Sequence, residues 1–224
     1  NQDRAGILAE GDTCLCYVAD GMGGHKGGEV ASAGARDGLT RILRGKDPDP
    51  KMLRFAVEAV NRRLYLQQKD DASLSGMGTT LTLLWAASKE VYIAQVGDSR
   101  AYLLRDGDFQ QITQDHSLVQ ELVNQGVLTP ELAAHHPMRN VITRAVGTDE
   151  GVEVDLFTKE RKLGDIWLLC TDGLSGMVPD EAIARILRTK APEAAADALL
   201  QTALDNGGRD NVTFVILKDE EGAQ

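Results

Sequence analysis

Three aspartates stand at the ends of apolar segments. Asp20 and Asp172 each close an apolar run and are followed by glycine, in CLCYVADGMGG (14–24) and IWLLCTDGLSG (166–176). Asp210 instead opens an apolar run, in GGRDNVTFVIL (207–217). Either Asp-Gly pair alone is an ordinary turn signal. Because the start of one antiparallel strand lies beside the end of its neighbour, we expect the three carboxylates to converge on one rim of the sheets.

Carboxylates that converge in this way repel each other, and burial raises their pKa values further. A divalent cation resolves that conflict. Carboxylate, carbonyl and water ligands without cysteine or histidine select hard ions, Mg²⁺ or Mn²⁺, over zinc. We expect Gly21 to let a backbone carbonyl turn toward such an ion.

The elements that position these aspartates are predicted strands that follow one another in pairs and predicted helices that form two groups along the sequence. Apolar periodicity predicts helices over 29–44, 51–69, 117–125, 179–189 and 192–205. Short apolar or alternating runs predict strands over 14–19, 79–87, 91–96, 100–105, 109–113, 152–158, 166–171 and 211–217. Asp106-Gly107 marks a hairpin. Short turns between paired strands favour an α+β fold with antiparallel sheets over a doubly wound parallel sheet.

Composition narrows the class of protein. The chain has 224 residues, a size that suits one domain, and a formal charge of −10 that argues against nucleic-acid binding. Aromatic residues make up 4%, too few for a base-stacking platform. No apolar run is long enough to span a membrane. Cys14, Cys16 and Cys170 form no disulfide framework, so we expect buried thiols and a cytoplasmic protein.

Eight motifs, in order and spread over nearly the whole chain, resemble those of the protein phosphatase 2C family, and DGMGGH with the QDHS motif is similar to its compact bacterial members. The motifs are NQD (1–3), VADGMGGH (18–25), GTT (78–80), GDSRAYL (97–103), ITQDHS (112–117), RNVITRAVG (139–147), CTDGLSG (170–176) and GGRDNVT (207–213).

The resemblance implies a fold and a metal centre. The fold is a four-layer α-β-β-α sandwich of two central antiparallel sheets flanked by helices, with two Mn²⁺ or Mg²⁺ ions in a cleft at one end. By position, Asp20 would bridge the ions, the Gly21 carbonyl would complete one site, and Asp172 and Asp210 would hold the other. Asp3 would bind through metal waters, and it completes the implied catalytic set.

Bacterial members also suggest a third ion. The matching positions are Asp115 and Asp172, and the alternative role for Asp115 is to cap a helix that starts near Ser117. The ions would lower the pKa of a shared water, and the resulting bridging hydroxide would attack phosphorus in line. The sequence contains no GK[ST] phosphate loop and no CxxxxxR thiol-phosphatase loop.

The chain departs from the family pattern in two places. It opens at Asn1, inside the first motif, so we expect residues to precede it, among them the family's phosphate-contacting arginine. Met22 stands where many eukaryotic members have a histidine that is a candidate general acid. His25 is the candidate substitute, with a solvated loop side chain as the alternative, whereas we expect a structural role for His116.

The segment 118–140 matches the position of the flap that borders the cleft in bacterial members, and its mobility would govern substrate choice. Arg139 and Lys26 are candidates for contacting a phosphopeptide, and the alternative for each is a solvated side chain. We expect His135 and His136 to face solvent. Asp98 is predicted to lie in a buried polar turn beneath the site.

These observations predict a metal-dependent phosphatase that hydrolyses phosphoserine and phosphothreonine in proteins. Its expected partners are phosphorylated substrates, including a Ser/Thr kinase, and we expect a monomer. One alternative is a catalytically silent module with the same fold that binds a phosphoprotein. The other, a phosphohydrolase with an aspartyl nucleophile, lacks the usual DxDx arrangement at both Asp-Gly sites.

Overall fold

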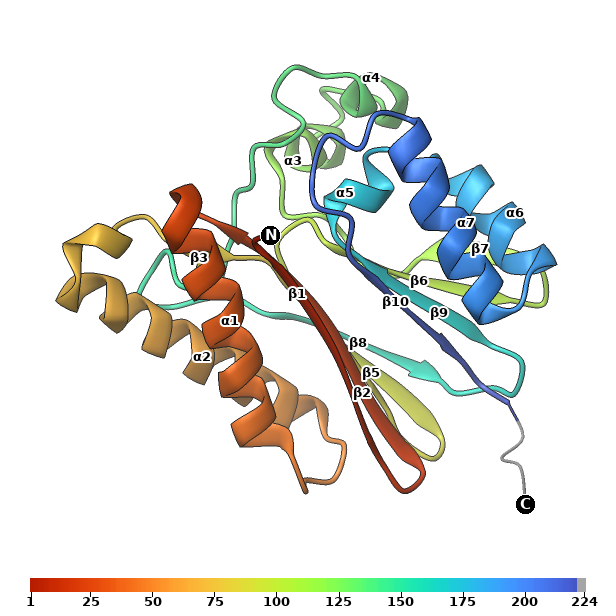
Figure 1. Ribbon diagram of the computed structural model, residues 1–224, viewed down its shortest axis with the longest axis horizontal. Coiled ribbons are helices and arrows are strands. Elements are labelled where there is room, and N and C mark those ends of the chain that lie inside the picture. Colours follow the sequence, from red (N-terminus) through yellow and green to blue (C-terminus); the bar gives the residue numbers. More distant parts are fainter. Residues whose placement is uncertain (221–224) are drawn as a thin grey trace.

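Two antiparallel sheets face each other in the computed structural model, which describes residues 1–220 (Figure 1). The first sheet has the order β1-β2-β4-β5-β8, and the short β3 also pairs with β2. Its strands are β1 (Asp3–Glu10), β2 (Thr13–Met22), β3 (Gly78–Thr79), β4 (Leu81–Ala86), β5 (Glu90–Val96) and β8 (Asp155–Glu160). The second sheet has the order β10-β9-β6-β7, formed by β6 (Arg100–Arg105), β7 (Asp108–Gln111), β9 (Ile166–Cys170) and β10 (Phe214–Lys218).

Helices cover the outer face of each sheet. The first sheet carries α1 (Gly24–Leu43) and α2 (Pro50–Asp70), and the second carries α6 (Asp180–Thr189) and α7 (Pro192–Asp205) (Figure 1). The remaining helices are the 3₁₀ turn η1 (Ala72–Leu74), α3 (Leu118–Asn124), α4 (Pro130–Ala134) and α5 (Asp172–Ser175). The predicted α-β-β-α sandwich with antiparallel sheets is confirmed.

Three apolar cores separate the four layers. One lies between α1, α2 and the first sheet, the second between the two sheets, and the third between the second sheet and α6 and α7. Alternation along β2 divides its side chains between two of them: Leu15 and Tyr17 face the helices, while Cys16 and Val18 face the other sheet. In the part of the chain described, no helix has the length and apolarity to cross a membrane.

Several element boundaries differ from the sequence prediction. Strand β1 was not predicted, because it has no run of buried apolar residues: Asp3 is buried, and only Arg4, Gly6 and Leu8 are partly buried. Helix α1 begins at Gly24 and not at Glu29, since glycines in its first turns interrupt the apolar periodicity. Strand β10 begins at Phe214, three residues after the predicted start. The Asp106-Gly107 hairpin is confirmed, and both residues have positive φ, 52° and 82°.

Candidate metal centre

Strand pairing brings Asp3, Asp20 and Asp172 together. Asp3 begins β1 and is the register partner of Asp20 near the end of β2. Asp20 shares the face of β2 that points toward the second sheet, where β9 ends and Asp172 begins α5. The Thr171 hydroxyl donates a hydrogen bond of 2.9 Å to Asp3 Oδ2 and so links the two sheets at this rim.

The two Asp-Gly pairs have a common structural reason for their glycine. A Cβ on Gly21 would lie 2.0 Å from the Gly28 carbonyl oxygen, so β2 and the start of α1 approach each other backbone to backbone. A Cβ on Gly173 would lie 1.9 Å from the carbonyl oxygen of Asn211. That second approach holds the segment that carries Asp210 against the start of α5. Each glycine therefore fixes the backbone beside a candidate ligand.

Burial and mutual repulsion dominate the electrostatics of this cluster. Burial, followed by the charges of Asp3 and Asp172, raises the pKa of Asp20 to about 9. Burial also raises the pKa of Asp3, although hydrogen bonds from Thr213 and Thr171 oppose the increase. The pKa of Asp172 is raised by burial and then by the nearby Asp210 charge. All of the largest influences on the pKa of Asp20 raise it, and none of them comes from a cationic side chain.

The cluster fits a hard divalent cation. Asp172 Oδ1 is buried and has no hydrogen-bond partner, which leaves a carboxylate oxygen available as a ligand. Asp20 is in hydrogen-bonding contact with both Asp3 and Asp172. Among residues 1–220, no three Asp, Glu, His or Cys side chains are spaced as ligands around one point. The donor set is nevertheless all oxygen, as Mg²⁺ and Mn²⁺ prefer.

The second residue of the chain ties three segments of the site together, and sequence reasoning missed it. The Gln2 backbone N–H donates to Asn211 Oδ1 (2.9 Å), and its side-chain amide donates to the Gly24 carbonyl (2.7 Å). The Ser32 hydroxyl of α1 donates to the Gln2 carbonyl (2.5 Å). Gln2 thereby connects the Asp210 segment with α1. The signal in the sequence is the motif NQD itself, in which the asparagine and glutamine precede the ligand.

Asp115 lies in an ion pair and does not join the aspartate cluster. The Arg100 guanidinium donates to both of its carboxylate oxygens, at 2.9 and 2.7 Å, and Gln111 donates to Oδ1 at 3.0 Å. The alternative role as a helix cap is wrong, because the Ser117 hydroxyl caps α3 by accepting from the Gln120 N–H.

Asp98 is a second buried carboxyl group on which the charge of Asp172 acts. It is 7% exposed, and burial followed by the charges of Asp172 and Asp115 raises its pKa to about 7. The polar turn predicted around it is present: the Ser99 and Thr80 hydroxyls lie 2.7 Å apart, and Thr80 Oγ1 accepts a hydrogen bond of 2.9 Å from the Asp20 N–H. Sequence reasoning placed Asp98 in this turn beneath the site but assigned its carboxyl group no part in metal binding.

Replacing Asp115 and replacing Asp98 should change the stability of the protein in different ways. Asp115→Asn leaves the mostly buried Arg100 guanidinium without its counter-charge, and we expect unfolding free energy to fall by about 2 kcal/mol. Asp98→Asn removes a carboxyl that is already unfavourably buried, so stability should be retained or increased in the absence of metal. Urea unfolding in the presence of EDTA measures both variants. Equal destabilisation by the two substitutions would contradict this assignment.

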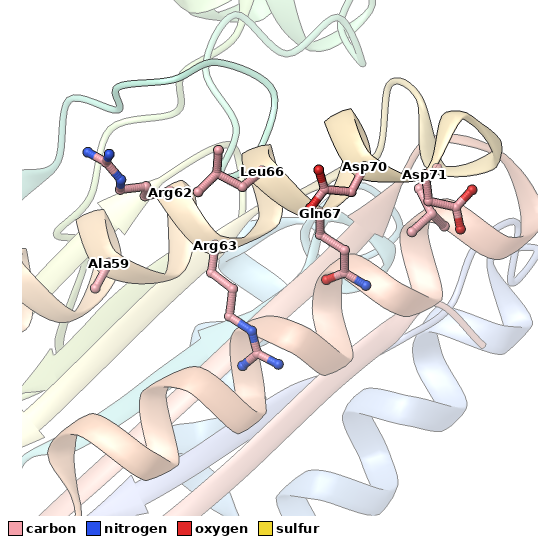
Figure 2. A pocket seen from close by; sticks show the side chains of 8 residues that line it. Ala59, Arg62, Arg63, Leu66, Gln67, Asp70 and Asp71 are labelled. Atoms are coloured by element: carbon pink, nitrogen blue, oxygen red, sulfur yellow. The ribbon is translucent and has the colours of Figure 1, made fainter.

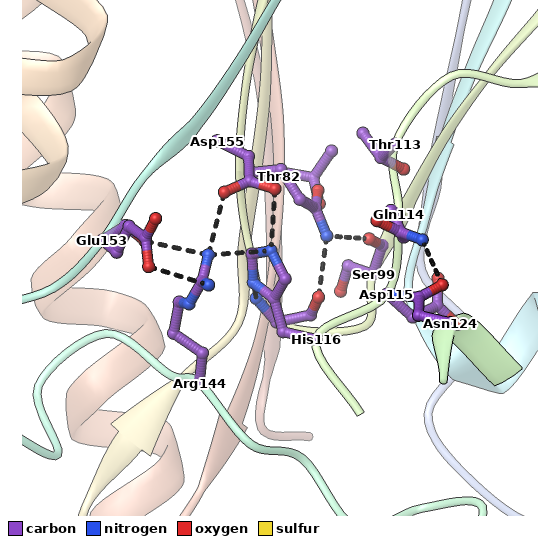
Figure 3. A network of polar contacts seen from close by, with 12 residues as sticks. Thr82, Ser99, Thr113, Gln114, Asp115, His116, Asn124, Arg144, Glu153 and Asp155 are labelled. Carbon is purple, nitrogen blue, oxygen red and sulfur yellow. Dashed lines mark hydrogen bonds and ion pairs between the residues drawn. The ribbon is translucent and has the colours of Figure 1, made fainter. Parts of the chain in front are cut away.

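A polar network anchors the base of the segment 118–140 (Figure 3). His116 Nδ1 accepts a hydrogen bond of 3.0 Å from the Gly97 N–H, so the ring hydrogen lies on Nε2, 3.2 Å from Asp155 Oδ2. Arg144 donates to Asp155 Oδ1 at 2.9 Å and pairs with Glu153 at 3.1 Å. Burial lowers the pKa of His116, in keeping with a neutral ring. This arrangement is the structural role expected for His116.

The segment 118–140 contains α3 and α4, and Figure 1 places it at the end of the sandwich that also holds the N-terminus and α5. Its base is closed by hydrogen bonds from Leu118 N to the Val141 carbonyl (2.9 Å) and from Thr143 N to the His116 carbonyl (2.9 Å). The polar network and these hydrogen bonds hold both ends of the segment on the sheet that carries Asp20.

Two of the candidate substrate-binding side chains, those of Arg139 and Lys26, are exposed to solvent. Arg139 is exposed in the turn after α4, and Lys26 is exposed in the first turns of α1. His25 belongs to the first turn of α1, and its side chain falls outside the described part of the structure. His135 is exposed as expected, whereas His136 is half-buried and its Nδ1 accepts from the Met138 N–H at 3.1 Å.

A hollow of about 710 Å³ runs along the outer face of α2 (Figure 2). It is lined by Ala59, Arg62, Arg63, Leu66, Gln67, Asp70, Asp71 and Leu74. None of these residues belongs to the aspartate cluster, and the hollow is open to solvent, so we assign it no part in the chemistry.

Comparison with known proteins places this geometry among phosphatases. A family model described as protein phosphatase 2C matches residues 1–206. The chain is 38% identical to the serine/threonine phosphatase stp of Listeria welshimeri, over 97% of this chain and 90% of that protein.

Solved structures agree with the family match. The crystal structure of the serine/threonine phosphatase Stp1 from Staphylococcus aureus has a TM-score of 0.93 and 41% identity, covering 99% of this chain and 90% of that one. The crystal structure of the catalytic domain of the phosphatase PstP in complex with two manganese ions has a TM-score of 0.85 and 40% identity, covering 96% of this chain and 90% of that one.

Proposed function

The chain belongs to the protein phosphatase 2C family, and we propose that it hydrolyses phosphoserine and phosphothreonine in proteins with two Mn²⁺ or Mg²⁺ ions. Its relatives in Listeria welshimeri and Staphylococcus aureus are named serine/threonine phosphatases. The family identity makes the chain a hydrolase of the phosphoprotein phosphatase class, and the manganese complex of PstP supports metal dependence.

The observation that carries the proposal is the buried carboxyl cluster, in which burial and the neighbouring carboxyl charges outweigh the single opposing charge of Arg100 on Asp172. Asp20 would be ionised only above a pH of about 9 when no metal is bound, because of burial and of its neighbours Asp3 and Asp172. A protein does not assemble such a cluster for stability, since each buried like charge costs free energy. Positive charge from divalent ions removes the conflict. Perturbed carboxyls in one place are a mark of functional sites.

We assign the ions to ligands on this chain. Asp20 would bridge the two ions, the Gly21 carbonyl would join one of them, and Asp172 and Asp210 would hold the other. The buried Oδ1 of Asp172, which has no partner, supports this assignment. When bound, such ions lower the pKa of water and offset charge on a phosphoryl group.

The remaining residues hold this arrangement in place. Asp3 is oriented by the Thr171 hydroxyl and lies across from Asp20, so it can accept a proton from water at Oδ1 or Oδ2. Asp210 is exposed, and the Gln2 N–H holds the next residue, Asn211, through its side-chain oxygen. The segment 118–140, anchored through His116, lies at the same end and would border the substrate.

For a third ion we propose Asp98 together with Asp172 in place of Asp115 and Asp172. Asp98 is buried beside Asp172, and the charge of Asp172 contributes to its raised pKa. Asp115 has both oxygens occupied by Arg100. A hydrogen-bonded carboxylate oxygen keeps a second lone pair, but the adjacent Arg100 charge would repel a cation bound at Asp115.

Activity of purified protein on a phosphothreonine peptide tests the function. We expect turnover with Mn²⁺, none with EDTA, and a loss of at least about 100-fold in kcat for Asp172→Asn, since one ligand of the reacting centre is removed. The matched control Asp197→Asn changes an exposed aspartate on α7 and should retain full activity. Unchanged turnover in Asp172→Asn would reject the metal assignment.

The alternative of a silent phosphoprotein-binding module predicts a different result in the same preparation. Such a module would bind the phosphopeptide without turnover and show no tight Mn²⁺ binding by calorimetric titration. Two observations favour the enzyme over the silent module. The chain retains Asp20, Asp172 and Asp210, and the relatives named above are phosphatases. A Ser/Thr kinase as partner, a monomeric state and a cytoplasmic location stay predictions.

A further inference from the structure

Cys14 and Cys16 lie on one face of β2, at the end of the strand that is away from Asp20. Their Sγ atoms are 3.7 Å apart in a thiol–thiol hydrogen bond. The expectation that all three cysteines are buried holds for Cys16 and Cys170 but is wrong for Cys14, which is half-buried. Cys14 pairs across the sheet with Ala9 and Ala86, whose small side chains leave its sulfur partly accessible.

Charges around the pair distinguish the two thiols. Arg161 is fixed at this end of the sheet by donating to the carbonyls of Asp12 (3.1 Å) and Ala87 (2.9 Å). The hydrogen bond from Cys16 and then the Arg161 charge lower the pKa of Cys14, against burial and the Asp219 charge. The hydrogen bond to Cys14 and burial raise the pKa of Cys16. Cys14 is thus the more accessible of the two sulfurs and the one whose pKa is lowered, so it is the thiol that reacts as a thiolate.

We propose that Cys14 and Cys16 are a redox modification site that closes to an intramolecular disulfide when a hydroperoxide oxidises Cys14. The Cys14 thiolate attacks the peroxide, the O–O bond breaks, and Cys14 becomes a sulfenic acid as the departing oxygen leaves protonated. Cys16 then loses its proton and attacks the Cys14 sulfur, which releases water. Overall, two S–H groups are oxidised to one S–S bond, and the hydroperoxide is reduced to an alcohol or water with one further water.

The position of the pair within one strand makes this bridge reversible. Residues two apart in an extended strand have Cα atoms about 6.6–6.8 Å apart, at the upper end of the range for disulfides, about 4.4–6.8 Å. Closing the bridge therefore requires β2 to contract at Leu15, which pairs with Leu8 and Trp85. A strained bridge is more easily reduced. We expect the oxidised protein to unfold about 2–4 °C lower than the reduced protein.

Mass spectrometry of the full chain, treated with a small excess of hydrogen peroxide in EDTA, tests the proposal. The peptide that contains Cys14 and Cys16 should lose two hydrogen atoms and regain them with dithiothreitol. Cys170 is the internal control: it is fully buried, and burial raises its pKa to about 12, so it should stay unmodified. A bridge that involves Cys170 or a second chain, or a wild-type protein that is not oxidised, would overturn the proposal.

Two variants establish the order of the steps. Cys14→Ser should abolish peroxide consumption at this site, and it changes a half-buried side chain, so the fold should be retained. Cys16→Ala removes the resolving thiol, and a dimedone adduct should accumulate on Cys14. If peroxide oxidises Cys16 in Cys14→Ser as fast as it oxidises the wild-type pair, Cys14 is not the reacting thiol. Should Cys16→Ala not fold, the wild-type disulfide and Cys14→Ser still decide the question.

Discussion

Asp20→Asn should increase the stability of the metal-free protein at neutral pH while it abolishes turnover. The substitution removes the carboxyl whose pKa burial, Asp3 and Asp172 raise to about 9. Such a group favours the folded state below its unfolded pKa of about 4 and loses that contribution as pH rises through about 9. The stability advantage of the variant should therefore grow from pH 5 to pH 9, reaching about 2–4 kcal/mol.

Adding Mn²⁺ should make the wild-type protein more stable than Asp20→Asn. Ions that bind only the folded state stabilise it, so wild-type protein should gain stability with Mn²⁺ and Asp20→Asn should gain much less. Thermal unfolding at pH 5, 7 and 9, with EDTA and with Mn²⁺, measures both effects, and Asp197→Asn, at an exposed position of α7, serves as the control. A variant that is less stable than wild type at pH 9 in EDTA would contradict the electrostatic account.

Gly21→Ala and Gly173→Ala should each destabilise the protein by about 3 kcal/mol, and both should weaken Mn²⁺ binding. The added methyl groups would lie 2.0 Å from the Gly28 carbonyl oxygen and 1.9 Å from the Asn211 carbonyl oxygen. Neither partner is a flexible side chain, so the backbone has to separate. In Gly21→Ala, α1 moves away from β2, and in Gly173→Ala the segment carrying Asp210 moves away from α5.

Gly151→Ala is the matched control, because a methyl group there meets no atom within 4 Å and the residue has no positive φ. We expect this variant to be within about 0.5 kcal/mol of wild type. Urea unfolding in EDTA gives the three stabilities, and calorimetric titration gives the Mn²⁺ affinities. Wild-type Mn²⁺ affinity in a folded Gly173→Ala would show that the approach of Asn211 to α5 does not position Asp210.

The strands and helices with strong periodicity were predictable, and those without it were not. Helix α2 and the hairpin at Asp106-Gly107 follow from local patterns, apolar spacing in one and turn residues in the other. Strand β1 has no comparable local signal, since it depends on pairing with β2 for its whole length. That pairing places Asp3 opposite Asp20, so the least predictable strand carries one of the site residues.

Residue types and their spacing determined the chemistry of this protein. Asp20 and Asp172 after apolar runs, and Asp210 before one, already indicated an all-oxygen cation site, because strand ends are local features and carboxylates prefer hard ions. Family motifs in order added the activity. The sequence determines these features because the types of neighbouring residues along the chain decide where a strand ends.

The tertiary structure alone decided which carboxyls share a site and which do not. The sequence suggested Asp115 as a metal ligand and placed Asp98 in a polar turn, yet Asp115 is paired with Arg100, and the Asp172 charge acts on the buried Asp98. The proximity of Cys14 to Arg161 likewise arises from packing between elements far apart in the chain. Charge pairing and desolvation depend on distances across the fold, and no local pattern of residues records them.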